Sequence, residues 1–289
     1  MIHYLRFIRL RSTLAIMGIQ AVVYYGLRKY PDGQIFDLSF LKLLAATFFV
    51  ISAGYMINDY FDIKTDSINK PHRLLIPRKI NRRKALLGNI FCNFIAFFIG
   101  LSISIYMGLY FAGVAALLFF YSAVLKRLFL VGNLAIAILM SVSIGILYQL
   151  NAELDSWWLS IYITFAFLGG WMQEILKDLK NLKGESRYNY QNIPNNFGIY
   201  KTKKFLGLLL VLIVIIFTVQ SFHLAIDHKY LSGFIVIILV FSPSSLFVYK
   251  LFNADKESDF NALYQQFKVL VICILAIIPF TNFVKTFLS

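Results

Sequence analysis

The stretch that decides the fold is residues 204–223, KFLGLLLVLIVIIFTVQSFH, in which no Asp, Glu, Lys or Arg follows Lys204. A transmembrane helix needs about 20 predominantly apolar residues, and this stretch has that length. Similar windows recur along the chain, and the nine together are residues 12–29, 36–57, 84–105, 108–124, 130–150, 156–176, 204–223, 230–251 and 266–286. The sequence therefore predicts an all-α fold, a polytopic membrane bundle of about nine transmembrane helices.

The boundary between the third and fourth windows is the least marked. Residues 101–121 are almost continuously apolar, with Gly108 and Gly113 as the only breakers. One helix through both windows would be about twice as long as the bilayer is thick. We therefore expect two helices joined by a tight turn.

The composition excludes an ordinary soluble domain. Of the 289 residues, 59% are hydrophobic and 15% are charged, and the mean hydropathy is +0.71, so most of the chain must have lipid as its solvent. The two cysteines, Cys92 and Cys273, both lie in apolar runs and indicate neither a disulfide framework nor a thiolate metal site. We expect a single intramembrane domain over residues 1–289, with acidic motif loops at about 58–84 and 174–203.

The formal net charge of +14 could suggest nucleic-acid binding, but the basic residues are spread over five segments and form no single patch. If the N-terminus is cytoplasmic, all but five of the 28 Lys and Arg residues lie on the inner side. The five exceptions are Arg28, Lys29, Lys42, Lys229 and Lys285. By the positive-inside rule this bias predicts a cytoplasmic N-terminus and an external C-terminus. Membrane topology thus accounts for the basic residues, and nucleic-acid binding is not needed to explain the net charge.

The end of the second window carries a cluster of acidic residues, Asn58-Asp59-Tyr60-Phe61-Asp62-Ile63-Lys64-Thr65-Asp66. Steps of three and four residues place Asp59, Asp62 and Asp66 within about 60° of one another on one helical face. Three carboxylates at the end of an apolar helix are costly and need a cation to hold them together. Magnesium is the natural candidate where phosphate shares the coordination shell.

The same spacing returns after the sixth window. Asp178, Asn181 and Glu185 repeat the three-then-four pattern at the end of another apolar helix. Two such faces predict a facing pair of metal-binding walls on the cytoplasmic side of the membrane.

These motifs resemble the UbiA superfamily of intramembrane prenyltransferases. The resemblance rests on Asn58-Asp59-x-x-Asp62-x-x-x-Asp66 with Asn69-Lys70-Pro71-x-Arg73, on the second acidic motif, and on Tyr121-Ser122-x-x-Leu125-Lys126-Arg127 with Gly132-Asn133. It extends over essentially the whole chain. Within the superfamily the first motif is most similar to the branch of digeranylgeranylglyceryl phosphate synthases and chlorophyll synthases. This chain departs from that branch at Asn181 and Glu185, where Asp is usual, and at Leu74 or Leu75, where a second Pro is usual.

The resemblance implies Mg2+-dependent transfer of a polyprenyl group from a prenyl diphosphate to a lipophilic acceptor. Asp59, Asp62 and Asp178 are the expected catalytic residues. The expected metal ligands are Asn58, Asp59, Asp62 and Asp66 for one ion and Asp178, Asn181 and Glu185 for the other. The expected substrate-binding residues are Arg73, Lys126, Lys177, Asn69 and Tyr121. The guanidinium of Arg73 and the ammonium groups of Lys126 and Lys177 would hold diphosphate oxygens.

Other functions remain open at this stage. The acceptor could be a prenylglyceryl phosphate or an aromatic quinone precursor. A transporter usually places its carboxylates near the bilayer midplane on broken helices, whereas these acids lie at helix ends. A lipid-binding scaffold would fit only if the second motif failed to hold metal. We expect an integral protein of a bacterial or archaeal cytoplasmic membrane, with its active site facing the cytoplasm.

Overall fold

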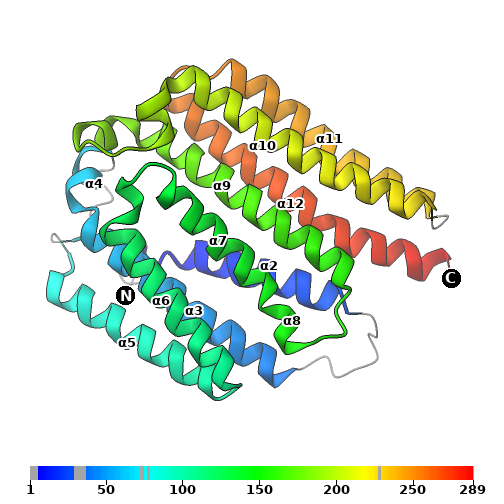
Figure 1. Cartoon of the computed structure of the whole chain (residues 1–289), viewed down its shortest axis with the longest axis horizontal. Coiled ribbons are helices and arrows are strands. Elements are labelled where there is room, and N and C mark those ends of the chain that lie inside the picture. The colour runs from blue at the N-terminus through cyan, green and yellow to red at the C-terminus, as the bar shows by residue number, and fades with distance from the viewer. Residues whose placement is uncertain are drawn as a thin grey trace. The chain divides into compact units, whose positions relative to one another are not determined.

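The computed structural model describes residues 6–28, 37–69, 71, 75–76, 79–226 and 229–288, with side chains to Thr281. Within these residues the regular secondary structure is helical, and an isolated β-bridge joins Arg28 and Leu154 (Figure 1). The helices in chain order are α2 (Leu10–Gly26), α3 (Leu38–Phe61), α4 (Ile63–Asn69), α5 (Arg82–Leu101), α6 (Ile105–Ala123), the 3-10 turn η2 (Leu125–Arg127), α7 (Val131–Gly145), α8 (Leu147–Leu150), α9 (Ser156–Arg187), α10 (Ile193–Ile226), α11 (Tyr230–Phe252) and α12 (Glu257–Leu288).

The expected helical membrane bundle is confirmed. In the described part of the chain, eight helical segments are long and apolar enough to cross a bilayer, and α7 and α8 together count as one of them. They correspond to the last eight of the nine expected windows. The first window corresponds to α2, whose 17 residues lie at the short end of the range for a transmembrane helix.

The chain divides into two compact units. The first comprises Met1–Gln20, Asp32–Ala135 and Lys183–Tyr190, and the second comprises Ala21–Pro31, Ile136–Leu182 and Gln191–Ser289. In the first unit α3 packs on both α5 and α6, and these two helices pack on each other. A buried hydrogen bond of 2.9 Å from the Asn89 side chain to the Ala53 carbonyl joins α5 to α3, so a polar group inside the apolar helix pair is satisfied.

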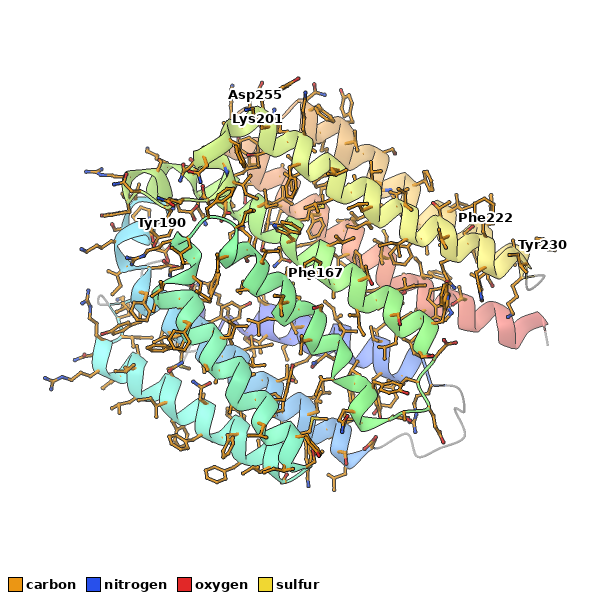
Figure 2. The ribbon with its side chains drawn as sticks, in the orientation of Figure 1. Phe167, Tyr190, Lys201, Phe222, Tyr230 and Asp255 are labelled. Atoms are coloured by element: carbon orange, nitrogen blue, oxygen red, sulfur yellow. The ribbon has the colours of Figure 1, made fainter. Side chains whose placement is uncertain are left out.

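In the second unit α10, α11 and α12 pack in sequence. The Tyr162 hydroxyl of α9 donates a hydrogen bond of 3.1 Å to the Ile274 carbonyl of α12. Large apolar side chains remain on outward faces, such as Phe222 and Tyr230, which are 66% and 63% exposed (Figure 2). In a membrane protein such faces meet lipid and do not need a protein partner.

The expected break between the third and fourth windows is confirmed, but it lies earlier than the windows placed it. α5 ends at Leu101 and α6 begins at Ile105. The break is set by polar capping and not by Gly108 or Gly113: the Ser104 hydroxyl accepts a hydrogen bond of 3.1 Å from the Met107 N–H. Gly100 makes the turn possible, because a Cβ there would lie 2.9 Å from the Met107 carbonyl oxygen and 2.8 Å from the Phe111 ring.

The second motif region differs from the expected loop at 174–203. α9 continues through the motif to Arg187, and α10 already begins at Ile193. No proline interrupts residues 177–187, so the helix continues past its apolar part. The non-helical Gly198, with φ 75° and ψ 166°, separates a short first turn of α10 from its long apolar part. The first motif region, expected as a loop from residue 58, likewise begins inside α3.

The tight approach at Gly100 gives a stability prediction. We expect Gly100→Ala to lower the thermal midpoint of the detergent-solubilised protein by several degrees, because overpacking costs about 1–3 kcal/mol. Gly113→Ala is the matched control, since no atom lies within 4 Å of a Cβ placed there. Its midpoint should stay level or rise slightly, because alanine favours helix more than glycine does. Equal midpoints for the two variants would contradict this account of the turn.

Candidate functional site

The first acidic motif lies where α3 passes into α4. Asp59 is in the last turn of α3, and Asp62 is its C-cap residue with φ −87° and ψ 5°. Asp66 is in the first turn of α4. Backbone hydrogen bonds continue through the junction, from the Asp62 N–H to the Asn58 carbonyl at 2.9 Å and from the Asp66 N–H to the Asp62 carbonyl at 2.8 Å. The three acids therefore belong to successive turns of one nearly continuous helical path.

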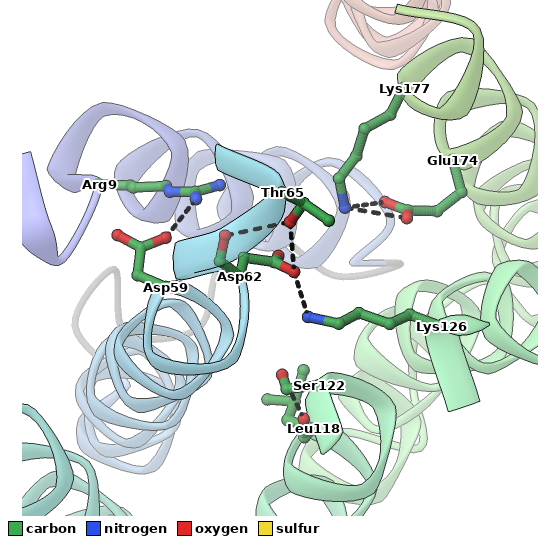
Figure 3. Close-up of polar contacts among 9 residues, drawn as sticks. All are labelled: Arg9, Asp59, Asp62, Thr65, Leu118, Ser122, Lys126, Glu174 and Lys177. Carbon is green, nitrogen blue, oxygen red and sulfur yellow. Dashed lines mark hydrogen bonds and ion pairs between the residues drawn. The ribbon is translucent and has the colours of Figure 1, made fainter. Parts of the chain in front are cut away.

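Two of these carboxylates are ion-paired within the first unit (Figure 3). Arg9 Nη2 lies 2.6 Å from Asp59 Oδ1, and Lys126 Nζ lies 2.6 Å from Asp62 Oδ1. The Lys126 and Asp62 side chains are only 7% and 16% exposed. The Thr65 hydroxyl adds a contact of 3.3 Å to Asp62 Oδ1. Charge-assisted contacts of this length are strong, so each acid has a dedicated cation from a distant part of the sequence.

Arg9 is fixed by its surroundings as well as by Asp59. Its guanidinium carbon lies 4.8 Å from the centroid of the Tyr55 ring of α3, which is a cation–π distance. Its backbone has a left-handed φ of 46°, so the chain changes direction there before α2 begins. The Thr13 hydroxyl donates a hydrogen bond of 3.0 Å to the Ile8 carbonyl on the other side of this bend.

The turn after α6 positions Lys126. The helix ends at Ala123, and η2 carries Lys126 at its centre. Gly132 allows the following chain to pass close by, because a Cβ there would lie 2.6 Å from the Lys126 Cα and 2.9 Å from the Leu125 carbonyl oxygen. The Leu125-Lys126-Arg127 and Gly132 pattern seen in the sequence therefore has a steric reason.

The second acidic motif lies on the polar end of α9. Asn181 and Glu185 are buried, with 6% and 8% exposure, and Asp178 is half-buried. Glu185 belongs to the first unit, together with Asp59, Asp62 and Asp66, whereas Asp178 and Asn181 belong to the second. The expectation that the two motifs face each other as metal-binding walls stays a prediction.

Lys177, expected to bind substrate, has a carboxylate partner one turn earlier. Its Nζ lies 3.0 Å from Glu174 Oε2 (Figure 3), and the Glu174 side chain is only 8% exposed. Glu174 was not among the expected site residues. Its position in the sequence could have indicated a site residue. A glutamate inside an apolar helix, four residues before Asp178, is costly unless it has a partner or a function.

The remaining expected substrate-binding residues have varied positions. Asn69, at the end of α4, accepts a hydrogen bond of 2.8 Å on its side-chain oxygen from the Gly184 N–H. This contact brings the end of the first motif region next to Glu185. Tyr121 is buried near the end of α6. Arg73 lies outside the described residues.

The sequence matches the UbiA prenyltransferase family over residues 20–272. The chain belongs to this family. A digeranylgeranylglyceryl phosphate synthase of Saccharolobus solfataricus is 32% identical to the chain over 206 residues, which are 68% of this chain and 69% of that protein. The protein of the same name from Methanosphaera stadtmanae is 24% identical over 95% of this chain and 96% of its own length.

Solved UbiA structures have the same fold. A UbiA homologue from Archaeoglobus fulgidus bound to GPP and Mg2+ matches with a TM-score of 0.70 at 16% identity, over 96% of this chain and 99% of that one. A digeranylgeranylglyceryl phosphate synthase structure matches with a TM-score of 0.69 at 24% identity, over 96% of each chain. The present chain is thus an integral membrane enzyme and a UbiA prenyltransferase.

The polar groups of this UbiA chain fit magnesium by their chemistry. Every expected ligand offers oxygen, which is the donor that magnesium prefers. Asn58 is buried, and its Oδ1 accepts no hydrogen bond from the described residues, so it is an oxygen that a metal could satisfy. Across the described residues, no three His, Cys, Asp or Glu side chains gather as one metal centre. Two of the first-motif acids are instead each paired with a base, Asp59 with Arg9 and Asp62 with Lys126.

Sequence reasoning missed two further groups near this UbiA site. Arg9 was counted only as a topology charge, and its only local signal was its place just before an apolar window. Tyr190 was not considered at all, although it is buried and its ring centroid lies 5.6 Å from the Arg127 guanidinium carbon. Contacts that join residues so far apart in the chain leave no pattern in a single sequence.

The buried Lys126–Asp62 pair gives a prediction for the metal-free protein. Lys126→Met would leave the Asp62 carboxylate without its cation, and we expect a loss of about 2 kcal/mol, below the usual cost for fully buried pairs because Asp62 keeps some exposure. The thermal midpoint in metal-free buffer should fall by several degrees. Adding Asp62→Asn to Lys126→Met should restore most of the loss. If the double variant is as unstable as the single one, the ion pair does not account for the effect.

Proposed function

We propose that this UbiA enzyme transfers a polyprenyl group from a prenyl diphosphate to a prenylglyceryl phosphate, with magnesium as its metal. The observation that carries the proposal is the cluster of alternating charge in the first unit, where two motif carboxylates are each held by a buried or half-buried base. The names of the relatives support the acceptor. The GPP and Mg2+ bound to the A. fulgidus homologue support the donor and the metal.

The reaction needs a site that tolerates a departing diphosphate. The C–O bond to diphosphate breaks, a new C–O bond forms to the acceptor hydroxyl, and the hydroxyl proton is released. Magnesium, when bound, neutralises the negative charge of the leaving group. Asn58, Asp59, Asp62 and Asp66 would hold one ion, and Asp178, Asn181 and Glu185 would hold the second.

The basic side chains have a complementary part in this proposal. A carboxylate that coordinates metal no longer needs its ammonium partner. Lys126 would then be available to bind a diphosphate oxygen, without moving far from Asp62. Arg73 and Lys177 would bind the same group, and Asn69 and Tyr121 would complete the substrate site.

The acceptor is tested by assaying the purified enzyme with a labelled prenyl diphosphate and two acceptors in parallel. We expect a prenylglyceryl phosphate to be converted and an aromatic quinone precursor to remain unchanged. Transfer to the aromatic acceptor alone would overturn the proposed acceptor while keeping the prenyltransferase assignment.

The role of Asp62 can be tested by its removal. Asp62→Ala should lower turnover at least about 100-fold, the scale expected when a group that stabilises transition-state charge is lost. Glu153→Gln is a suitable control, because Glu153 is exposed and belongs to the second unit. It should retain near-normal turnover. A folded Asp62→Ala protein with normal turnover would contradict the assignment.

We also propose that the N-terminus and the acidic motifs face the cytoplasm and that the C-terminus is external, with α2 crossing the membrane as a ninth span. A reporter that is active only in the cytoplasm should give no signal when fused after Ser289. The same reporter fused after Lys256, between α11 and α12, should be active. Activity of both fusions would mean that the C-terminus is inside and that the arrangement of nine spans is wrong.

A further inference from the structure

The polar end of α9 and the first turns of α12 meet around one tyrosine ring. Lys180 Nζ lies 5.0 Å from the centroid of the Tyr264 ring, and Lys268 Nζ lies 4.7 Å from the same centroid. Both are cation–π distances. The two nitrogens therefore lie no farther apart than the sum of these distances, about 9.7 Å. Like charges at this range repel each other, and an anion between them would remove the repulsion. All three residues belong to the second unit.

The directions of the two helices bring these side chains to one level. α9 and α12 are joined by the hydrogen bond from Tyr162 and run in opposite directions (Figure 1). Side chains on a helix lean toward its N-terminus. Lys180 therefore leans back toward the apolar part of α9, whereas Tyr264 and Lys268 lean toward the polar start of α12. The three side chains thus converge near the boundary between the polar and apolar parts of both helices.

Lys268 lies on a face of α12 that meets lipid. It is exposed, and the neighbouring Val269 and Ile272 are 52% and 65% exposed. Tyr264, Lys268 and Ile272 are spaced four residues apart, so they form one stripe along the helix. A lysine at the polar edge of a lipid-facing stripe extends its ammonium group to the level of the lipid headgroups. Tyrosine is also enriched at that level.

No carboxylate within the described residues is ion-paired with Lys268. Its Nζ contacts the side-chain oxygen of Gln265 at 3.3 Å and the Tyr264 ring, so its partners are an amide and an aromatic ring. Lys177 of α9 differs in this respect, because its charge is offset by Glu174. A lysine without a carboxylate beside it, close to a second ammonium group, is suited to an anionic ligand such as a phosphate.

We propose that Lys180 and Lys268, held by Tyr264, bind the headgroup phosphate of an anionic phospholipid from the surrounding membrane. A membrane lipid is favoured over a soluble phosphate because Lys268 lies at the edge of a lipid-facing stripe. Basic side chains between helices near the membrane surface are suited to such headgroups. Lys180 lies two residues after Asp178, about 160° around α9 from it, so this site is on a different face from the second acidic motif. The inference goes beyond the proposed function and does not depend on the acceptor.

The test measures lipid binding to the full-length enzyme in detergent by native mass spectrometry, which counts bound lipids and gives an apparent Kd. One probe is dioctanoyl phosphatidylglycerol, which is anionic. The second is dioctanoyl phosphatidylcholine, which has the same phosphate but carries its own cation. Inorganic phosphate is added as a soluble competitor. The variants are Lys180→Gln, Lys268→Gln, Tyr264→Leu and Tyr264→Phe. Lys250→Gln is the matched control, because Lys250 is an exposed lysine in the last turn of α11 and its loss changes the net charge equally.

We expect the wild type to bind phosphatidylglycerol at least about fivefold more tightly than phosphatidylcholine. Lys180→Gln and Lys268→Gln should each weaken the phosphatidylglycerol affinity about fivefold, which is the scale for one basic residue near an anionic membrane surface. Tyr264→Leu should weaken it about twofold to fivefold, because both charges remain but the ring that holds them is lost. Tyr264→Phe keeps the ring and should keep most of the affinity. Lys250→Gln should change it less than about twofold, as expected for a single exposed charge.

Any of four results would overturn the proposal. Equal affinities of the wild type for the two lipids would mean that no site for an anionic headgroup exists. An unchanged affinity in Lys268→Gln, or an equal loss in Lys250→Gln, would mean that the attraction is spread over the basic surface. Equal affinities in Tyr264→Leu and the wild type would mean that the ring does not form the site. Displacement of phosphatidylglycerol by an equal concentration of inorganic phosphate would mean that the ligand is a soluble anion.

Discussion

The constraint on which the site depends is the cost of placing acids at the end of an apolar helix. Asp59 and Asp62 end α3 with side chains that are only 17% and 16% exposed, where an unpaired charge is strongly disfavoured. Their partners come from opposite ends of the first unit's sequence, Arg9 before α2 and Lys126 after α6. The two ion pairs therefore hold the N-terminal segment and the η2 turn against the end of α3.

The fold was largely predictable because its signal is local. Apolar windows of about 20 residues locate helices without knowledge of any contact, and eight of the windows correspond to helices of spanning length. The ends of the helices were harder to predict. The turn before α6 depends on Ser104 as a cap and on the space at Gly100, and α9 extends past its apolar part to Arg187. Hydropathy describes the lipid-facing length of a helix and not where its hydrogen bonds stop.

The candidate site was predictable in part, for a similar reason. Regular spacing on a helix identified Asp59, Asp62 and Asp66 as one group, because i, i+3 and i+4 positions share a face. The spacing did not predict which basic residue pairs with each acid. The Lys126–Asp62 contact joins residues 64 positions apart, and nothing in the sequence distinguishes Arg9 from the other N-terminal arginines.

Tyr190 illustrates a different limit, since its position follows from a single backbone angle. Had Asn189 kept a right-handed helical φ, α9 would have continued and Tyr190 would have pointed elsewhere on the helix. The left-handed turn instead directs an aromatic side chain toward the acids, with the Glu185 carbonyl as its anchor. The site thus contains two kinds of cation. Arg9 and Lys126 are paired with carboxylates, whereas the Arg127 guanidinium carbon lies 5.6 Å from the centroid of the Tyr190 ring.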